Sequence, residues 1–390
     1  MAQREQRVTP LELFFDLVFV FAITQVTLLM SDDPTWEGLA RGLVVLAALW
    51  WAWSLYAWLT NMLEPEEGRV RAGMFAGMAA MLVVALAVPE AFDAHGTLFG
   101  LAYLVVRVLQ VLLYFFAAKR EPDPHLVAAV VRLTPPVLAA PLIILAGGFF
   151  DGAAQALLWL AALAVDYFGV LRGDGEGWRV APAHFAERHG LIVIVALGES
   201  IVSIGVGAAG EAITPGIVAA GVLGIVVIAA LWWAYFDVYA VMAERQLAQA
   251  RGVARVRLAR DYYSYLHLPM IAGIVLFALG LKKTLEHVDD PLETVPAVAL
   301  TGGLALYFLT HVALRVRLVH FVRRATTQRP GWIGPGRLVT GIGMLALLPA
   351  ALELSALTAL AAVTGLCCAL LAYDVIHYRQ ERAQVRQARP

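Results

Sequence analysis

Twelve apolar windows, each about as long as a membrane-crossing helix, run through this sequence of 390 residues. They fall at 10–30, 37–60, 72–92, 97–118, 126–147, 152–172, 188–209, 214–240, 262–282, 294–314, 337–354 and 356–377. A bilayer core needs about 20 apolar residues per helix, and the backbone inside it must satisfy its own hydrogen bonds. Only 15% of the residues are charged, against about 25% in soluble domains. The sequence therefore predicts an all-α integral membrane protein with about twelve transmembrane helices.

The basic residues collect on one side of these predicted spans. If the N-terminus is cytoplasmic, all but four of the 29 Lys and Arg residues lie at cytoplasmic segments, the exceptions being Arg41, Arg107, Lys282 and Lys283. Cytoplasmic loops of membrane proteins carry such an excess of positive charge. We therefore expect an even number of spans, with both the N-terminus and the C-terminus in the cytoplasm.

One helix sequence occurs twice in the chain. Residues 42–52 read GLVVLAALWWA and residues 224–234 read GIVVIAALWWA, so nine of eleven positions are identical and the other two exchange Leu for Ile. Weaker matches follow in the same order: 15–27 with 189–201, Tyr103 with Tyr307, Arg107 with His311, and Asp166 with Asp374. The sequence thus predicts two parallel six-helix repeats, 1–178 and 179–390. Transporters with parallel repeats hold their sites near mid-membrane at the repeat interface.

Two segments resemble the hallmarks of a known family. The opening TPLELFFDLVFVFAI, residues 9–23, resembles the first helix of the bacterial low temperature requirement A family. The stretch from HFAERHG to GESI, residues 184–201, resembles that family's second hallmark. The resemblance implies a multi-pass protein of the bacterial cytoplasmic (inner) membrane. The family name derives from a cold-growth phenotype and supplies no biochemical activity.

A shorter similarity concerns the first helix alone. The pattern Phe14-x-Asp16-x-Val18-Phe19 is similar to the first-helix motif of endolysosomal potassium channels, which also duplicate a six-span unit. Here Phe15 and Leu17 stand where that motif has Ser and Gly. A cation channel is therefore an alternative hypothesis to a transporter.

Two acidic residues fall near the start of the first predicted span. Glu12 and Asp16 are four residues apart and share one helical face. The sequence Thr9-Pro10-Leu11-Glu12 predicts a capping box with Pro at the first helical position, which accounts for Glu12. Asp16 lies deeper in the span, where a carboxylate needs a cationic partner or a proton. A structural ion pair and a role in proton transport both remain open for it.

Glu199 is the deepest acidic candidate. It lies about ten residues, or roughly 15 Å, inside its predicted span. Ser203 follows one turn later on the same face, so the two side chains are expected to form a polar stripe. Arg188 and His189 stand at the start of the same span, and Arg188 is too far along the axis to contact Glu199. A transport role and a structural ion pair remain open for Glu199.

Arg107 falls within a predicted span and always carries its charge. It needs a carboxylate, and Asp16, Asp166 and Glu199 are the candidates that the sequence leaves open. His311, the residue aligned with Arg107, either titrates near neutral pH or is a satisfied buried histidine.

The leading hypothesis is a transporter of a small solute or ion, coupled to protons through Glu199 and Asp16 with Arg107 as charge partner. The alternatives are the cation channel and a membrane-embedded enzyme or lipid-handling protein.

There is no His-Glu-x-x-His motif and no phosphate-binding loop, so we expect no enzyme activity and no cofactor. The arginines of 251–260 are expected in a cytoplasmic loop against lipid headgroups, which makes the bilayer a partner and excludes nucleic acid. The oligomeric state is left open. The candidate transport residues are Glu199, Asp16, Glu12, Arg107, His189, Arg188, His311 and Ser203.

Overall fold

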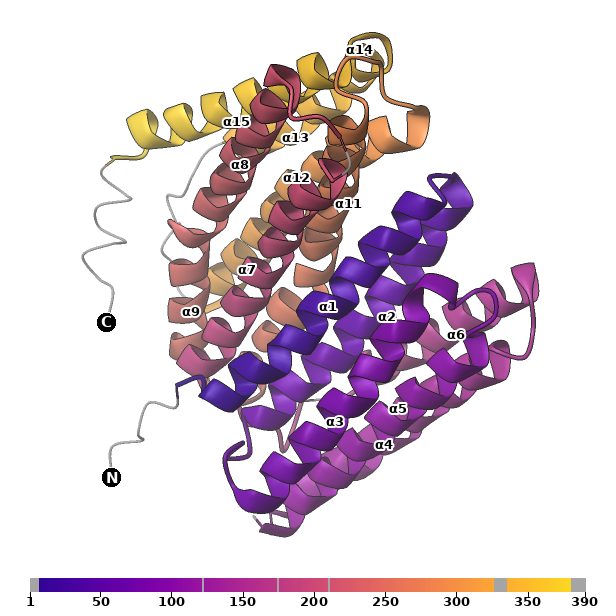
Figure 1. The fold of residues 1–390 in the computed structure, drawn as a ribbon. Coiled ribbons are helices and arrows are strands. Elements are labelled where there is room, and N and C mark those ends of the chain that lie inside the picture. Colours follow the sequence, from indigo (N-terminus) through magenta and orange to yellow (C-terminus); the bar gives the residue numbers. More distant parts are fainter. Residues whose placement is uncertain (1–6, 121–122, 174, 210, 326–334, 380–390) are drawn as a thin grey trace. The chain divides into compact units, whose positions relative to one another are not determined.

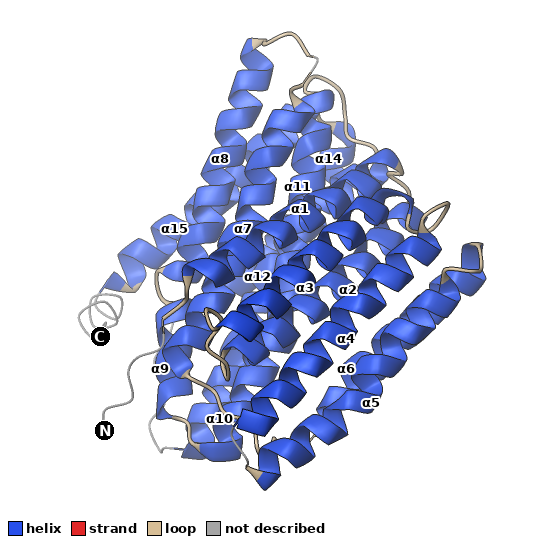
Figure 2. Ribbon diagram, turned by 60° about the horizontal axis from the view of Figure 1, so that its bottom comes forward, coloured by secondary structure: helices blue, strands red, loops and turns tan. Residues whose placement is uncertain are grey.

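The computed structural model describes residues 7–120, 123–173, 175–209, 211–325 and 335–379, with the side chains of 322–325 excepted. Over these residues the chain is helical throughout, apart from connecting loops, and contains no strand (Figure 2). Twelve of the described helical stretches are long and apolar enough to cross a membrane. The protein is therefore the all-α, multi-pass membrane protein that the sequence predicts.

The chain folds into two compact units. The first comprises 1–33, 37–189 and 250–260, and the second comprises 34–36, 190–249 and 261–390. Helix α7, Pro182–Gly207, contributes its first eight residues to the first unit. The predicted division of the sequence into repeats 1–178 and 179–390 stays a prediction.

The first unit is built mainly from six helices, of which α3 to α6 pack against one another in chain order (Figure 1). Helix α2 is the most buried of the described spans. The helices of this unit, apart from the start of α7, are α1 (Pro10–Asp32), α2 (Trp36–Thr60), α3 (Gly68–Ala87), the 3-10 turn η1 (Val88–Glu90), α4 (Gly96–Arg120), α5 (Pro124–Gly147), α6 (Gly152–Leu171) and α10 (Gly252–Leu258).

The first helix begins as its sequence predicts. The Thr9 side chain accepts a hydrogen bond from the Glu12 backbone N–H, and the Glu12 carboxylate accepts one from the Thr9 N–H, so the capping box is confirmed. Each of these bonds satisfies a backbone donor that has no partner within the helix. The cap also fixes where the Glu12 side chain lies, at the end of the span.

Besides the rest of α7, the second unit contains several helical segments, among which α12 is the longest of the described helices of the chain. These segments are α8 (Pro215–Phe236), α9 (Tyr239–Gln249), the π-helical η2 (Ala259–Tyr265), α11 (His267–Glu286), α12 (Thr294–Ala325), α13 (Gly336–Ala346), α14 (Leu348–Glu353) and α15 (Ala356–His377). Helices α13 and α14 together form the eleventh span, and Leu354 and Ser355 separate it from α15. The two closely spaced spans that the sequence predicts at 337–354 and 356–377 are therefore confirmed.

Helices α11 and α12 approach closely because glycines line their contact. A Cβ atom at Gly280 would lie 2.5 Å from the backbone nitrogen of Leu300, and one at Gly273 would lie 2.7 Å from the carbonyl oxygen of Gly303. Both distances are too short for any larger residue without movement of the backbone. Small residues serve helix association in membranes in this way, by allowing backbones to pack directly.

The expectation of a loop over the arginines of 251–260 is wrong. Residues 252–260 form α10 and the start of η2, and Arg251 is the N-cap residue before α10. Val256 and Leu258 are buried, and Arg255 donates to the carbonyl oxygens of Ala250 and Val180. Arginine is a good helix former, and Val253, Val256 and Ala259 recur every three residues, which gives the helix one apolar face to bury.

Candidate functional site

The first unit buries a group of polar side chains contributed by α1, by α2 and the residue after it, and by the start of α7. We call this group the α1–α7 cluster. Its most exposed member has 6% of its surface accessible. The members are Glu12, Asp16, Trp53, Asn61, His184 and Arg188.

Arg188 is the cationic partner of Asp16. Its Nη1 and Nη2 atoms donate to the two oxygens of the Asp16 carboxylate at 3.0 Å each. The indole nitrogen of Trp53 donates to the same carboxylate at 2.9 Å. The guanidinium carbon of Arg188 lies 5.7 Å from the centre of the Trp53 ring, within the range of a cation–π contact. The deep carboxylate of α1 is thus held by a bidentate ion pair.

Glu12 accepts hydrogen bonds from two directions. The Nε2 atom of His184 lies 3.0 and 3.2 Å from its two carboxylate oxygens. The backbone nitrogen and the hydroxyl of Thr9 lie 2.9 and 3.1 Å from Oε2. Arg188 Nε is 3.7 Å from Oε1. Glu12 is therefore more than a helix cap, because it also shares the cation of Asp16.

The amide of Asn61 determines which nitrogen of His184 carries a proton. Asn61 Oδ1 accepts from the backbone N–H of Ala181 at 2.7 Å, and its Nδ2 lies 3.4 Å from the Ala181 carbonyl oxygen. These backbone groups fix the orientation of the amide, so its NH₂ group points at His184 Nδ1, 3.0 Å away. An NH₂ group only donates. His184 Nδ1 therefore accepts, and the Nε2–H donates to Glu12.

Arg107 pairs with Asp166, one of the three carboxylates that the sequence leaves open. Arg107 Nη2 donates to both carboxylate oxygens at 2.7 and 2.8 Å, and Nη1 donates to Gln110 Oε1 at 3.2 Å. Gln110 in turn donates to the carbonyl oxygen of Ala52 at 2.7 Å. The hypothesis of Arg107 as charge partner of Asp16 is therefore wrong, because the Asp16 carboxylate binds Arg188 instead.

His189 lies among aromatic rings next to the α1–α7 cluster. The centres of the Trp53 and Phe185 rings are 5.0 and 4.5 Å from the centre of its imidazole ring. Its Nδ1 atom is 2.9 Å from the carbonyl oxygen of Phe185, one helical turn earlier. His189 thus packs against Trp53, the residue that donates to Asp16.

The candidates of the second unit are buried as well. Ser203 Oγ donates to Glu199 at 3.2 Å, and each side chain is 2% exposed, so the expected contact is present. His311 is fully buried, and its Nδ1 lies 2.9 Å from the Tyr307 carbonyl oxygen. The centre of the Tyr239 ring is 5.1 Å from that of His311.

The second unit also contains an arginine–aspartate pair that sequence reasoning did not predict. Arg337 Nη1 donates to Asp374 at 2.9 Å, and its Nη2 donates to the carbonyl oxygen of Ala234 at 3.2 Å. Asp374 aligns with Asp166, but its cation comes from α13, while Arg107 lies on α4. The alignment pointed to His311 as the partner position, so it gave no signal for Arg337.

His184 and Asn61 are two members of the α1–α7 cluster that the sequence did not put forward as site candidates. The signal for His184 was present, since it precedes Arg188 by four residues and so shares its helical face. Asn61 gave no signal, because it follows the last residue of α2. Among the described residues, no group of three His, Cys, Asp or Glu side chains is placed to hold a metal ion.

Comparison with known proteins gives one family. The sequence model of the bacterial low temperature requirement A protein matches residues 7–372. An uncharacterized protein of Rhizobium meliloti (strain 1021) is 31% identical over 306 residues, which cover 76% of this chain and 74% of that relative. No solved structure matches.

Proposed function

The chain belongs to the bacterial low temperature requirement A family, and from that premise we propose that this multi-pass membrane protein is a proton-coupled transporter of a small solute or ion. The observation that carries the proposal is the contact of two buried carboxylates, Glu12 and Asp16, with the single arginine Arg188 in the α1–α7 cluster. Glu12 and Asp16 accept hydrogen bonds from nitrogen and hydroxyl donors, as ionised carboxylates do. Arg188 is the one permanent cation among the cluster's members. With a neutral His184 the cluster has a net charge of −1.

One further proton makes this cluster neutral. A buried charge without a partner is costly inside a membrane protein, and imidazole is the side chain that most readily gains a proton near neutral pH. His184 Nδ1 is the acceptor that the geometry leaves for that proton, since Nε2 already faces Glu12. His184 is therefore the proposed proton-binding residue, and Glu12, Asp16 and Arg188 set the charge around it.

Protonation of His184 also changes the contacts of the chain. An N–H at Nδ1 would face the NH₂ group of Asn61, so two donors would oppose each other at 3.0 Å. Turning the Asn61 amide relieves this but removes the 2.7 Å bond to the N–H of Ala181. Ala181 directly precedes Pro182, the first residue of α7. Proton binding is thereby linked to the start of a membrane-spanning helix, and coupled transport requires such a link between a bound ion and a conformation.

The remaining candidate residues have other roles in the proposed transporter. The Arg107–Asp166 pair is electrically balanced, so we assign it a structural role. Glu199, bonded to Ser203, is the proposed second carboxylate, in the second unit. The proposal involves no covalent chemistry and therefore no enzyme activity. The proposed location is the bacterial inner membrane with both termini in the cytoplasm, following the distribution of Lys and Arg.

The test is proton movement in liposomes that contain the purified protein and a pH-sensitive dye. A pH gradient is imposed, and amino acids, sugars, organic acids and metal cations are added in turn. We expect a solute-dependent proton flux in the native protein that is lost in His184→Gln and Glu12→Gln. The matched control is Glu37→Gln, which changes an exposed carboxylate paired with Arg41 and should leave the flux unchanged. Equal flux in native protein, both variants and empty liposomes would overturn the proposal.

A further inference from the structure

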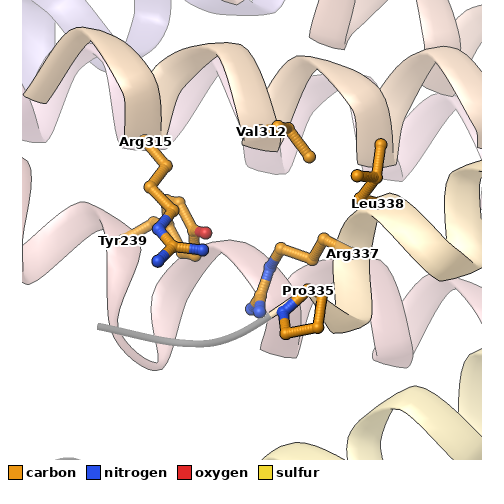
Figure 3. A pocket seen from close by; sticks show the side chains of 6 residues that line it. All are labelled: Tyr239, Val312, Arg315, Pro335, Arg337 and Leu338. Atoms are coloured by element: carbon orange, nitrogen blue, oxygen red, sulfur yellow. The ribbon is translucent and has the colours of Figure 1, made fainter. Parts of the chain in front are cut away.

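The second unit contains a half-open cavity of about 320 Å³ between α9, α12 and the start of α13 (Figure 3). Figure 3 shows the side chains of Arg315 and Arg337 reaching toward the Tyr239 ring, while Val312 and Leu338 lie farther from that ring. The described residues that line the cavity include two arginines and no carboxylate. They are Tyr239, Val312, Arg315, Pro335, Arg337 and Leu338.

Arg337 is held in position from several sides. It is 4% exposed, and its guanidinium carbon lies 4.6 Å from the centre of the Tyr239 ring. Asp374 and the carbonyl oxygen of Ala234 each accept from one terminal nitrogen. Its Nε–H has no hydrogen-bond partner among the described residues. Each terminal nitrogen of an arginine carries two N–H groups, so Nη1 and Nη2, with one bond each to Asp374 and Ala234, can also donate to an acceptor in the cavity.

The position of Arg315 along α12 indicates where the cavity lies across the membrane. Arg315 follows Thr294, the first residue of α12, by twenty-one residues, which corresponds to about 32 Å along a helix. The hydrocarbon core of a bilayer is about 30 Å thick. If α12 enters the core near its first residue, Arg315 lies at the level of the lipid headgroups on the other side.

We infer that this cavity binds a phosphate group, carried either by an anionic lipid or by a small soluble phosphate. Planar guanidinium groups bind phosphate oxygens through paired hydrogen bonds, and Arg315 and Arg337 supply two such groups. Val312, Pro335 and Leu338 provide an apolar wall for the first carbons of the bound molecule. The cavity volume is at the lower end of the range for small-molecule sites, and basic pockets between membrane helices hold lipid headgroups in this way. The inference does not rest on proton-coupled transport.

The test measures thermal unfolding of the purified protein in a nonionic detergent. One arm adds sodium phosphate against sodium chloride at equal ionic strength, and the other adds phosphatidylglycerol against phosphatidylcholine. We expect a saturable rise in Tm with phosphate, with phosphatidylglycerol, or with both. Saturation by phosphatidylglycerol alone identifies a lipid site, whereas saturation by inorganic phosphate identifies a site for soluble phosphates.

Variants on α12 distinguish the cavity from general charge effects. Arg315→Gln is expected to weaken binding roughly tenfold or more, because it removes a hydrogen bond to a charged group. The matched control Arg317→Gln removes an equal charge two residues away, where the side chain pairs with Asp261, and should bind as the native protein does. Arg315→Lys, which keeps the charge but not the paired donors, replaces Arg315→Gln if that variant does not fold. The inference is overturned if no ligand raises Tm, or if the Arg315 variant binds as tightly as the Arg317 variant.

Discussion

The carboxylate of Asp166 accepts two hydrogen bonds from a single nitrogen of Arg107, Nη2, at 2.7 and 2.8 Å. Both side chains are at most 1% exposed. Replacing Arg107 alone by Leu would leave a buried carboxylate without its cation, which typically costs about 3–5 kcal/mol. We expect Arg107→Leu to lower the Tm strongly, and Arg107→Leu with Asp166→Leu to recover most of the loss.

The control for this prediction is the exposed pair of Arg41 and Glu37, where the Glu37 side chain is 68% exposed. Exposed pairs contribute about 0–1 kcal/mol, so Arg41→Leu should change the Tm little. A double variant no more stable than Arg107→Leu alone would show that the buried pair is not the cause.

Asn61→Asp should change the protonation of His184. The new carboxylate can still accept from the Ala181 N–H, but it offers His184 Nδ1 an acceptor in place of an NH₂ group. An acceptor on each side favours the doubly protonated imidazole. Nitrogen NMR of histidine-labelled protein should show both His184 nitrogens protonated at neutral pH in the variant, and only Nε2 protonated in the native protein. Identical His184 signals in the two proteins would refute the hydrogen-bond pattern described above.

Replacing Gly280 or Gly365 by alanine should change the stability of the protein in opposite directions. A Cβ at Gly280 would lie 2.5 Å from a backbone atom of α12, whereas one at Gly365 meets nothing within 4 Å. Gly280→Ala is therefore expected to lower stability by about 1–3 kcal/mol through overpacking. Gly365→Ala is expected to raise stability by up to about 1 kcal/mol, because alanine favours a helix more than glycine does. Chemical unfolding in detergent measures both, and a loss of similar size in each would contradict the prediction.

The orientation in the membrane can be tested by cysteine labelling. The native thiols, Cys367 and Cys368, are first replaced by Ala. A single Cys is then introduced at Glu66, on the side predicted to be cytoplasmic, or at Asp93, on the side predicted to face outward. We expect an impermeant maleimide to label Asp93→Cys in intact cells and to label Glu66→Cys only after the membrane is opened. The reverse pattern would invert the proposed topology.

Much of the fold was predictable because its signals are local. Span lengths, the capping box at Thr9 and Glu12, and the contact of Ser203 with Glu199 depend on residues close together in the sequence. Helical spacing also gave the face on which Asp16 lies. It did not give the neighbour on that face, because Arg188 is 172 residues away.

The arginine–aspartate pairs show a second limit on what the sequence predicts. The alignment of the two halves places His311 at the position of Arg107, so it predicts no cation beside Asp374. The cation comes from Arg337, on a different helix. Charge balance inside a membrane protein can be met from any neighbouring helix, and the sequence does not say which helix is the neighbour.

The close contact of α11 and α12 through Gly273, Gly280 and Gly303 affects how the association of these helices depends on temperature. Lipid chains are as apolar as the side chains that they touch, so helices in a membrane associate mainly through van der Waals packing and hydrogen bonds. The hydrophobic effect, on which soluble proteins depend, weakens on cooling. Direct backbone packing draws little on that effect, so this helix pair should hold together as the temperature falls.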